Sequence, residues 1–126
     1  MVTRPILVSV EDEEGIYELL RLTLEPLPVD FYHAFNGVDA IQLIAEKKPN
    51  LLILDIGLPD MNGWDVLKAV IAENIKPDNI IVLTAYNAPT HRLIAHLQAV
   101  DLYLNKPFIP NELRKIIAEM LDLETY

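Results

Sequence analysis

Unbroken apolar runs that end abruptly in a polar residue limit most strongly how this chain can fold. Leu51–Leu54 leads directly into Asp55, and Ile80–Leu83 leads directly into Thr84. A strand with one face in water alternates apolar and polar residues, whereas these runs do not alternate. The runs are therefore typical of strands that are covered on both faces. Strands of this kind occur in parallel sheets, so the sequence predicts a parallel sheet with polar groups at the strand ends.

Helical spacing separates these runs, so short strands and helices alternate along the chain. Ile16, Leu19 and Leu20, for example, fall on one face of a helix. The expected strands are Pro5–Val10, Val29–Ala34, Leu51–Leu54, Asn79–Leu83 and Asp101–Leu104. The expected helices carry the apolar stripes Ile16–Leu24, Val38–Ala45, Trp64–Ile71, Leu93–Leu97 and Leu113–Leu121. All nine prolines lie between these elements or at their ends, which supports the boundaries.

This alternation predicts an α/β fold, with a doubly wound five-stranded parallel sheet and helices on both faces. In such sheets a ligand binds outside the carboxyl ends of the strands, at a topological switch point. Reactive side chains follow the first, third, fourth and fifth strands, whereas the second strand ends at Ala34-Phe35-Asn36-Gly37 without a comparable charge. The flavodoxin-like strand order 2-1-3-4-5 would gather the four reactive ends, and we expect that order.

Composition limits the partners of the chain. With 126 residues, 52% of them hydrophobic, it has material for one core, and we expect residues 1–126 to form a single domain. A net charge of −9 disfavours direct binding to nucleic acid and favours metal ions or cationic partners. The absence of cysteine excludes disulfides and thiolate metal sites. No apolar stretch approaches the ~20 residues of a membrane span, so we expect a cytoplasmic protein without a membrane partner.

The polar residues at the strand ends give the chain a family resemblance. Glu11-Asp12, Asp55 within Leu-Asp-Ile-Gly-Leu-Pro, Thr84 within Leu-Thr-Ala, and Lys106 within Lys-Pro-Phe occur in a specific order and at specific separations. In these motifs the chain resembles a response-regulator receiver domain of two-component signalling, over essentially its whole length. The resemblance implies that Asp55 accepts a phosphoryl group from a histidine kinase or a histidine phosphotransfer protein, forming an acyl phosphate.

The resemblance also implies a Mg²⁺ site around Asp55. Asp12 and Asp55 would bind the ion directly, Glu11 would bind it through water, and the backbone carbonyl of Gly57 would complete the protein ligands. The expected activity is self-catalysed phosphoryl transfer with slow autodephosphorylation, rather than that of a conventional enzyme.

Three further residues take roles by the same resemblance. Lys106 and Thr84 would contact phosphoryl oxygens, and Tyr103 would act with Thr84 as a switch. The switch would change the surface formed by the fourth helix, the fifth strand and the fifth helix, and dimerisation through that surface is a common outcome in the family. The resemblance also implies a cis Lys106–Pro107 peptide bond.

Each candidate also has a simpler interpretation when it is taken alone. Asp55 could be a turn residue, Thr84 a helix cap, Lys106 a solvated surface residue, and Tyr103 a half-buried strand aromatic. The histidines lack the paired spacing of metal ligands, and we interpret His33, His91 and His96 as surface or loop residues. Trp64 is expected to anchor the third helix to the core.

Two other functions stay open beside the receiver interpretation, and the chain also departs from the family pattern. The first acid is Glu11 rather than the commoner Asp, and Ile109-Pro110 replaces a frequent Ser-Pro, which would leave the last helix without a hydroxyl cap. One alternative is a pseudo-receiver that acts as an interaction module without phosphorylation. Glu11 and the turn Ala99-Val100-Asp101, which stands where the family usually has Gly-Ala-Asp, keep this alternative open. The other is a Mg²⁺-dependent phosphohydrolase, which would need a general acid or base where Gly57 stands.

Overall fold

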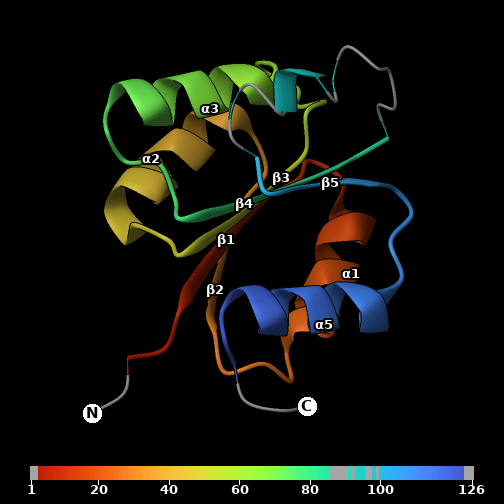
Figure 1. Cartoon of the computed structure of the whole chain (residues 1–126). Helices are drawn as coiled ribbons and strands as arrows, with labels where there is room; N and C mark the ends of the chain where they lie inside the picture. The colour runs from red at the N-terminus through yellow and green to blue at the C-terminus, as the bar shows by residue number, and fades with distance from the viewer. Residues whose placement is uncertain (1–2, 86–90, 92, 96–97, 99, 124–126) are drawn as a thin grey trace.

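A parallel sheet of five strands forms the centre of the computed structural model, which describes residues 3–85, 91, 93–95, 98 and 100–123 (Figure 1). The strands are β1 (Ile6–Val10), β2 (Asp30–Ala34), β3 (Leu51–Leu54), β4 (Asn79–Thr84) and β5 (Leu102–Asn105). Their order in the sheet is β2-β1-β3-β4-β5, and every neighbouring pair is parallel. The predicted fold class and strand order are therefore confirmed.

Helices cover both faces of this sheet (Figure 1). They are α1 (Glu14–Leu24), α2 (Gly37–Lys47), α3 (Gly63–Ala72) and α5 (Pro110–Met120). Helices α1 and α5 lie together on one face, and α2 and α3 lie together on the other. Of the expected fourth helix, His91 and residues 93–95 are helical, whereas Leu97 lies outside the described residues.

The central strand β3 is buried on both sides. Leu52 and Leu54 belong to the core cluster shared with α2 and α3, while Leu51 and Ile53 belong to the cluster shared with α1 and α5. None of these four side chains is more than 2% exposed. Burial of one such side chain is worth roughly 1.5–3 kcal/mol, and a shift of the strand by one residue would exchange its two faces. The core therefore fixes where β3 ends and where the next residue, Asp55, begins.

Three strands begin one residue later than expected, at Ile6, Asp30 and Leu102, and two end one residue later. Strand β4 includes Thr84 and β5 includes Asn105, because these two residues pair in the parallel ladder. Thr84 was expected to follow its strand, and instead it is the last residue of the strand. Thr84 therefore lies in the sheet itself rather than in the loop that follows it.

The helices begin in two different ways. Asn62 starts α3 by accepting a hydrogen bond from the Trp64 amide, and Asn36 caps α2 in the same manner through Asp39. Helix α5 has no side-chain cap at Ile109 and begins with Pro110, as expected from the missing hydroxyl residue. Trp64 is 5% exposed and belongs to the core cluster, which confirms its expected anchoring role. Within the described ranges, no helix has the length and apolar character needed to cross a membrane.

Gly63 brings the start of α3 directly against the backbone that carries Asp55. A Cβ atom on Gly63 would lie 2.5 Å from the Asp55 carbonyl oxygen and 2.8 Å from the Ile56 Cα atom. The Gly63 amide also donates a hydrogen bond to the Ile56 carbonyl at 2.8 Å. Because both obstacles are backbone atoms, no side-chain rotation can make room for a larger residue.

We expect Gly63→Ala to lower the free energy of unfolding by roughly 1–3 kcal/mol, since the added methyl group must displace backbone. Gly15→Ala is the matched control, because a Cβ there meets nothing within 4 Å and the position lies in helix α1. The control should raise the unfolding free energy by about 0.5–1 kcal/mol through helix propensity. Urea melts of both variants test this, and equal effects at the two glycines would contradict the close approach.

Candidate metal site at the carboxyl edge of the sheet

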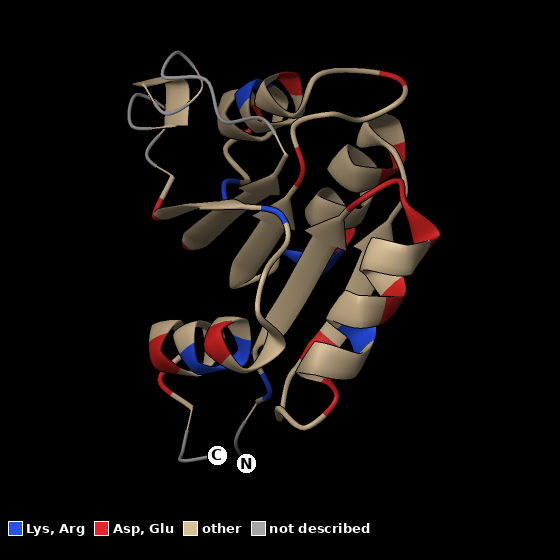
Figure 2. Cartoon of the chain, turned by 90° about the vertical axis from the view of Figure 1, so that its right-hand side faces the viewer, with Lys and Arg blue, Asp and Glu red and all other residues tan. Residues whose placement is uncertain are grey.

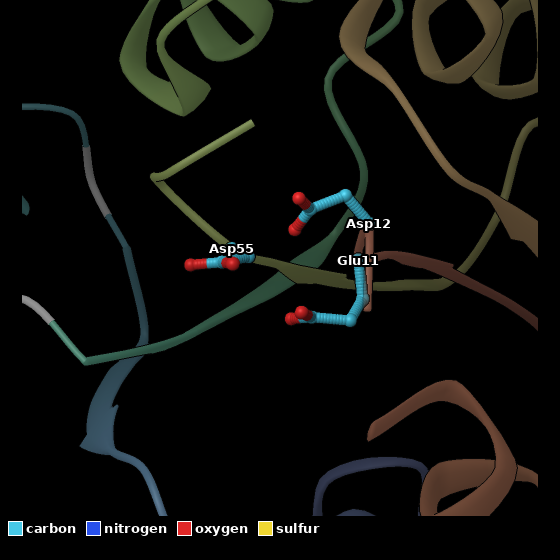
Figure 3. A group of neighbouring side chains, drawn as sticks. All are labelled: Glu11, Asp12 and Asp55. Atoms are coloured by element: carbon cyan, nitrogen blue, oxygen red, sulfur yellow. The ribbon is translucent and has the colours of Figure 1, made fainter. Parts of the chain in front are cut away.

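Three carboxylate groups converge where β1 and β3 end. Glu11 and Asp12 follow β1, and Asp55 follows β3, which pairs with β1 so that Val10 lies opposite Leu54. One carboxylate oxygen from each of the three residues lies within 4.8 Å of the other two. Figure 3 shows the Glu11 and Asp12 side chains extending from the end of β1 toward the side on which Asp55 lies. The predicted acidic residues are therefore brought together by the strand order.

The ammonium group of Lys106 lies between two of these carboxylates. Its Nζ atom is 2.7 Å from Glu11 Oε2 and 3.1 Å from Asp55 Oδ2, and the Lys106 side chain is 11% exposed. The Lys106–Pro107 peptide bond is cis, as the resemblance implied. Figure 2 shows acidic residues spread widely over a chain that has 19 acidic and 10 basic residues. Within the cluster, the single positive charge of Lys106 is smaller than the negative charge of three carboxylates, and this excess of negative charge favours binding of a cation.

Burial changes the protonation of this cluster. Burial, opposed by the hydrogen bond from Lys106 and reinforced by the charge of Asp55, raises the pKa of the Glu11 carboxyl to about 7. Burial alone would lower the pKa of the Lys106 amine, but its hydrogen bond to Glu11 and the charges of Asp55 and Glu11 outweigh burial and raise it. The lysine therefore stays charged, whereas the glutamate titrates near neutral pH.

Backbone contacts hold Asp55 in place. Its amide donates to the Val10 carbonyl at 3.0 Å, and the Gly57 amide donates to Asp55 Oδ1 at 3.3 Å. The Asp55 residue is 5% exposed. The second carboxylate oxygen of Asp55 lies 3.1 Å from Lys106 Nζ, which argues against Asp55 as an ordinary turn residue.

Thr84 and Tyr103 lie on the neighbouring strands β4 and β5. Thr84 is fully buried, and its carbonyl accepts a hydrogen bond from the Lys106 amide at 2.9 Å. Tyr103 is half-buried and packs against the core cluster beside its ladder partner Val82. This backbone hydrogen bond connects Thr84 to Lys106. The switch role of Thr84 and Tyr103 stays a prediction.

Asp60 is a structural residue that the sequence analysis missed. Its carboxylate accepts hydrogen bonds from the Gly37 amide at 2.8 Å and the Val38 amide at 2.9 Å. These two hydrogen bonds lower the pKa of the Asp60 carboxyl. Asp60 thereby connects the loop that follows Asp55 to the first turn of α2, where a negative charge is favourable. Its place in a loop rich in turn formers hid this role, because the partner helix is distant in sequence.

The interpretation of the histidines as surface or loop residues was wrong for His33. This residue lies in β2, is half-buried, and hydrogen-bonds through Nε2 to the Glu11 carbonyl oxygen at 2.9 Å. His91 accepts a hydrogen bond from the indole nitrogen of Trp64 at 2.9 Å, and His96 lies outside the described residues. The alignment of His33 with Ser9 in the parallel ladder is the signal that could have found its contact with β1.

An open pocket of about 440 Å³ lies beside the candidate site. It is lined by residues of the loop between β3 and α3, namely residues 56–62, and by His91. Ile56 and Gly57 belong both to this lining and to the segment that directly follows Asp55. The pocket provides space for a group that approaches the loop from solvent.

Comparison with known proteins agrees with this architecture. The family model described as "Response regulator receiver domain" matches residues 6–118, so the chain belongs to the receiver domains of response regulators, which act in two-component signalling. It is 33% identical to the signal receiver domain of a Luxo repressor protein from Vibrio parahaemolyticus, with a TM-score of 0.88 and coverage of 95% of this chain and 92% of that chain.

Two further solved structures are similar over nearly their whole length. One is the CheY-like response regulator receiver domain protein from Methanospirillum hungatei JF-1, with 26% identity, a TM-score of 0.86, and coverage of 95% of both chains. The other is a DNA-binding response regulator of the LuxR family from Staphylococcus aureus, with 28% identity, a TM-score of 0.81, and coverage of 92% of this chain and 98% of that chain.

The donor atoms at this edge of the sheet fit a hard divalent cation. Glu11, Asp12 and Asp55 offer only carboxylate oxygens, and no thiolate exists in the chain. Mg²⁺ prefers oxygen ligands and keeps several waters, and the exposed position of Asp12 beside two buried acids leaves one side of the cluster toward solvent. The acidic cluster therefore fits a receiver metal site.

We expect the metal-free protein to lose stability relative to Glu11→Gln as the pH rises from about 4.5 to about 7. The folded-state pKa of Glu11 lies above its unfolded value, so the folded protein holds the proton more tightly. This contribution is complete below pH 4.5 and disappears as the pH rises through 7. The difference between the two proteins isolates Glu11 from Asp12, Asp55, Lys106 and His33, which both contain.

Urea melts in a metal chelator, repeated at several pH values, measure that difference. A difference that does not depend on pH would contradict a buried, partly protonated Glu11.

We expect Asp55→Asn to raise the metal-free unfolding free energy by roughly 1–2 kcal/mol, because it removes one of three repelling carboxylates without changing shape. It should also reduce the stabilisation by added Mg²⁺, since Mg²⁺ stabilises the folded state by binding to it. Asp65→Asn is the control, because this exposed residue of α3 undergoes the same chemical change outside the cluster. Its effect should stay within about 0.5 kcal/mol. Urea melts with and without Mg²⁺ test both, and a less stable metal-free Asp55→Asn would identify Asp55 as a structural cap.

Proposed function

We propose that this receiver domain accepts a phosphoryl group on Asp55, in a Mg²⁺-dependent transfer from a histidine kinase or a histidine phosphotransfer protein. The observation that carries the proposal is the cluster of Glu11, Asp12 and Asp55 within 4.8 Å, with Lys106 Nζ 3.1 Å from Asp55. A carboxylate nucleophile beside a fixed cation and two further acids is suited to attack on a phosphoryl group. We further propose that residues 1–126 form one such domain.

In the proposed reaction, an Asp55 carboxylate oxygen attacks the phosphorus atom of a phosphohistidine. The phosphorus–nitrogen bond breaks, the imidazole nitrogen keeps the electron pair, and an acyl phosphate forms on Asp55. Mg²⁺, when bound by Asp12 and Asp55, with Glu11 acting through water and the Gly57 carbonyl completing the ligands, would offset the negative charge of the phosphoryl oxygens.

The remaining site residues act on the product. Lys106 Nζ already lies at hydrogen-bonding distance from Asp55, so a small movement would bring the ammonium group to a phosphoryl oxygen of the product. The Thr84 hydroxyl would bind another phosphoryl oxygen from the end of β4. Lys106 and Thr84 are joined by a backbone hydrogen bond of 2.9 Å, which supports their acting on one group.

The proposed output is a change in the surface around β5 and α5. Movement of Thr84 toward the phosphoryl group would leave room for Tyr103, which lies on the neighbouring strand β5 and packs against the core cluster shared with α2 and α3. Phosphorylation would thus bias a two-state element through a local change in charge. In many receivers such a surface supports dimerisation, and we propose a phosphorylation-dependent homodimer as one outcome here.

Incubation with acetyl phosphate and Mg²⁺ tests the proposal, with mass spectrometry of the intact protein as the readout. We expect one phosphoryl group per chain on the wild type, slow loss of that group, and none on Asp55→Asn or in the presence of a metal chelator. Asp65→Asn should be phosphorylated like the wild type, because Asp65 is exposed on α3 outside the cluster. Absence of labelling would favour a pseudo-receiver, and turnover of many equivalents would favour a phosphohydrolase.

The same phosphorylated sample tests the switch through backbone amide chemical shifts. Changes should extend from the Asp55 loop to β5 and α5. Changes confined to the Asp55 loop would contradict a propagated switch.

A further inference from the structure

His33 connects the edge strand β2 to the metal-site residues that follow β1. Its Nε2 atom is 2.9 Å from the Glu11 carbonyl oxygen, and its Nδ1 atom is hydrogen-bonded to the Ser9 hydroxyl. A carbonyl oxygen only accepts, so Nε2 must carry the hydrogen and donate it. In the neutral ring Nδ1 is then the acceptor, and the Ser9 hydroxyl donates to it.

Residues of β2 therefore hold both backbone polar groups of Glu11. The Glu11 amide donates to the Ala34 carbonyl at 3.1 Å, and the Glu11 carbonyl accepts from the adjacent His33 side chain. Glu11 lies one residue past β1, so its carbonyl lies beyond the named ladder of β1 and β2. The imidazole of His33 supplies a hydrogen bond at that point and fixes the backbone from which the side chains of Glu11 and Asp12 extend.

Aromatic rings hold the imidazole in this orientation. The ring centroid of Tyr17, from α1, is 4.3 Å from that of His33, and the centroid of Phe35 is 4.5 Å away. These ring contacts limit rotation of the imidazole. Burial also lowers the pKa of His33, which favours the neutral ring that the two hydrogen bonds require.

We propose that His33 is a positioning residue for the metal site, which acts by holding the backbone of Glu11 so that the Glu11 and Asp12 carboxylates face Asp55. Ser9 assists by fixing the tautomer of the ring. The inference rests on the proposed Mg²⁺ site and adds a residue that touches neither the ion nor the phosphoryl group. Preorganisation of a ligand's support is a recognised determinant of metal affinity.

His33→Phe keeps a flat ring in the aromatic cluster and removes both hydrogen bonds. We expect it to weaken Mg²⁺ binding roughly 3- to 10-fold, the size of one lost hydrogen bond that supports a ligand. His33→Gln, whose amide offers a donor and an acceptor, should restore affinity to within about twofold of the wild type. Phe31→Leu is the matched control, because it alters the same ring cluster from the same strand at a centroid distance of 6.4 Å from His33 and removes no hydrogen bond of His33, and it should bind Mg²⁺ like the wild type.

Calorimetric titration with Mg²⁺ measures the affinities, and urea melts of the same samples measure stability separately. A folded His33→Phe that binds Mg²⁺ as tightly as the wild type would overturn the positioning role and leave the proposed function intact. A wild type that binds no Mg²⁺ would overturn both.

Two measurements serve if His33→Phe does not fold. Ser9→Ala removes only the hydroxyl partner of Nδ1, and it should weaken Mg²⁺ binding when His33 is present. In a protein that already carries His33→Gln, adding Ser9→Ala should cause little further loss of Mg²⁺ affinity. Nitrogen chemical shifts of the imidazole in the metal-free wild type should identify Nε2 as the protonated atom above pH 7. Protonation of Nδ1 instead would overturn the inference, because Nε2 could then not donate to the Glu11 carbonyl. Unchanged Mg²⁺ affinity in Ser9→Ala would also overturn it, because Ser9 would then not support the orientation of His33.

Discussion

The contact of one lysine with two buried carboxylates is the interaction on which the arrangement of the candidate site depends. Lys106 lies 2.7 Å from Glu11 and 3.1 Å from Asp55, while Asp12 adds a third acid nearby. The three carboxylates have oxygens within 4.8 Å of one another, and each pair of like charges at this distance costs on the order of 1 kcal/mol or more. The sheet supports this arrangement because the strands that carry these residues are fixed by apolar burial on both faces. Stability from the core is thus separated in space from the chemistry at the edge.

The fold and much of the site follow from local patterns in the sequence. The apolar run Leu51–Leu54 by itself predicts a buried strand. Asp55 directly follows this run, so it must lie at the carboxyl edge of the sheet. The strand order followed from the position of the reactive ends and is confirmed. Strand β4 ends one residue later than predicted, at Thr84. Its end depends on the pairing of Thr84 with Asn105, which the sequence of neither strand specifies alone.

The contacts that sequence analysis missed join segments that are far apart in the chain. Asp60 binds amides of α2, and His33 binds the carbonyl of Glu11, 22 positions away in sequence. A histidine without a neighbouring ligand residue gives no local signal, and an aspartate in a turn has several ordinary roles. The role of His33 becomes visible only when the parallel register has placed it beside Ser9, and that of Asp60 only when the loop after β3 has been placed against the start of α2.

The position of Asp60 also affects how this chain can be divided. Helix α2 begins with two amide groups whose acceptor is supplied by the loop after β3, beyond the end of the helix itself. A fragment that ends at β3 would contain the whole of α2, including Asp39 in its first turn, but it would lack Asp60 and leave those two amides to water. The first half of the molecule is therefore incomplete as a separate folding unit, and helix α2 reaches its full stability only when the chain has been synthesised past the acceptor loop.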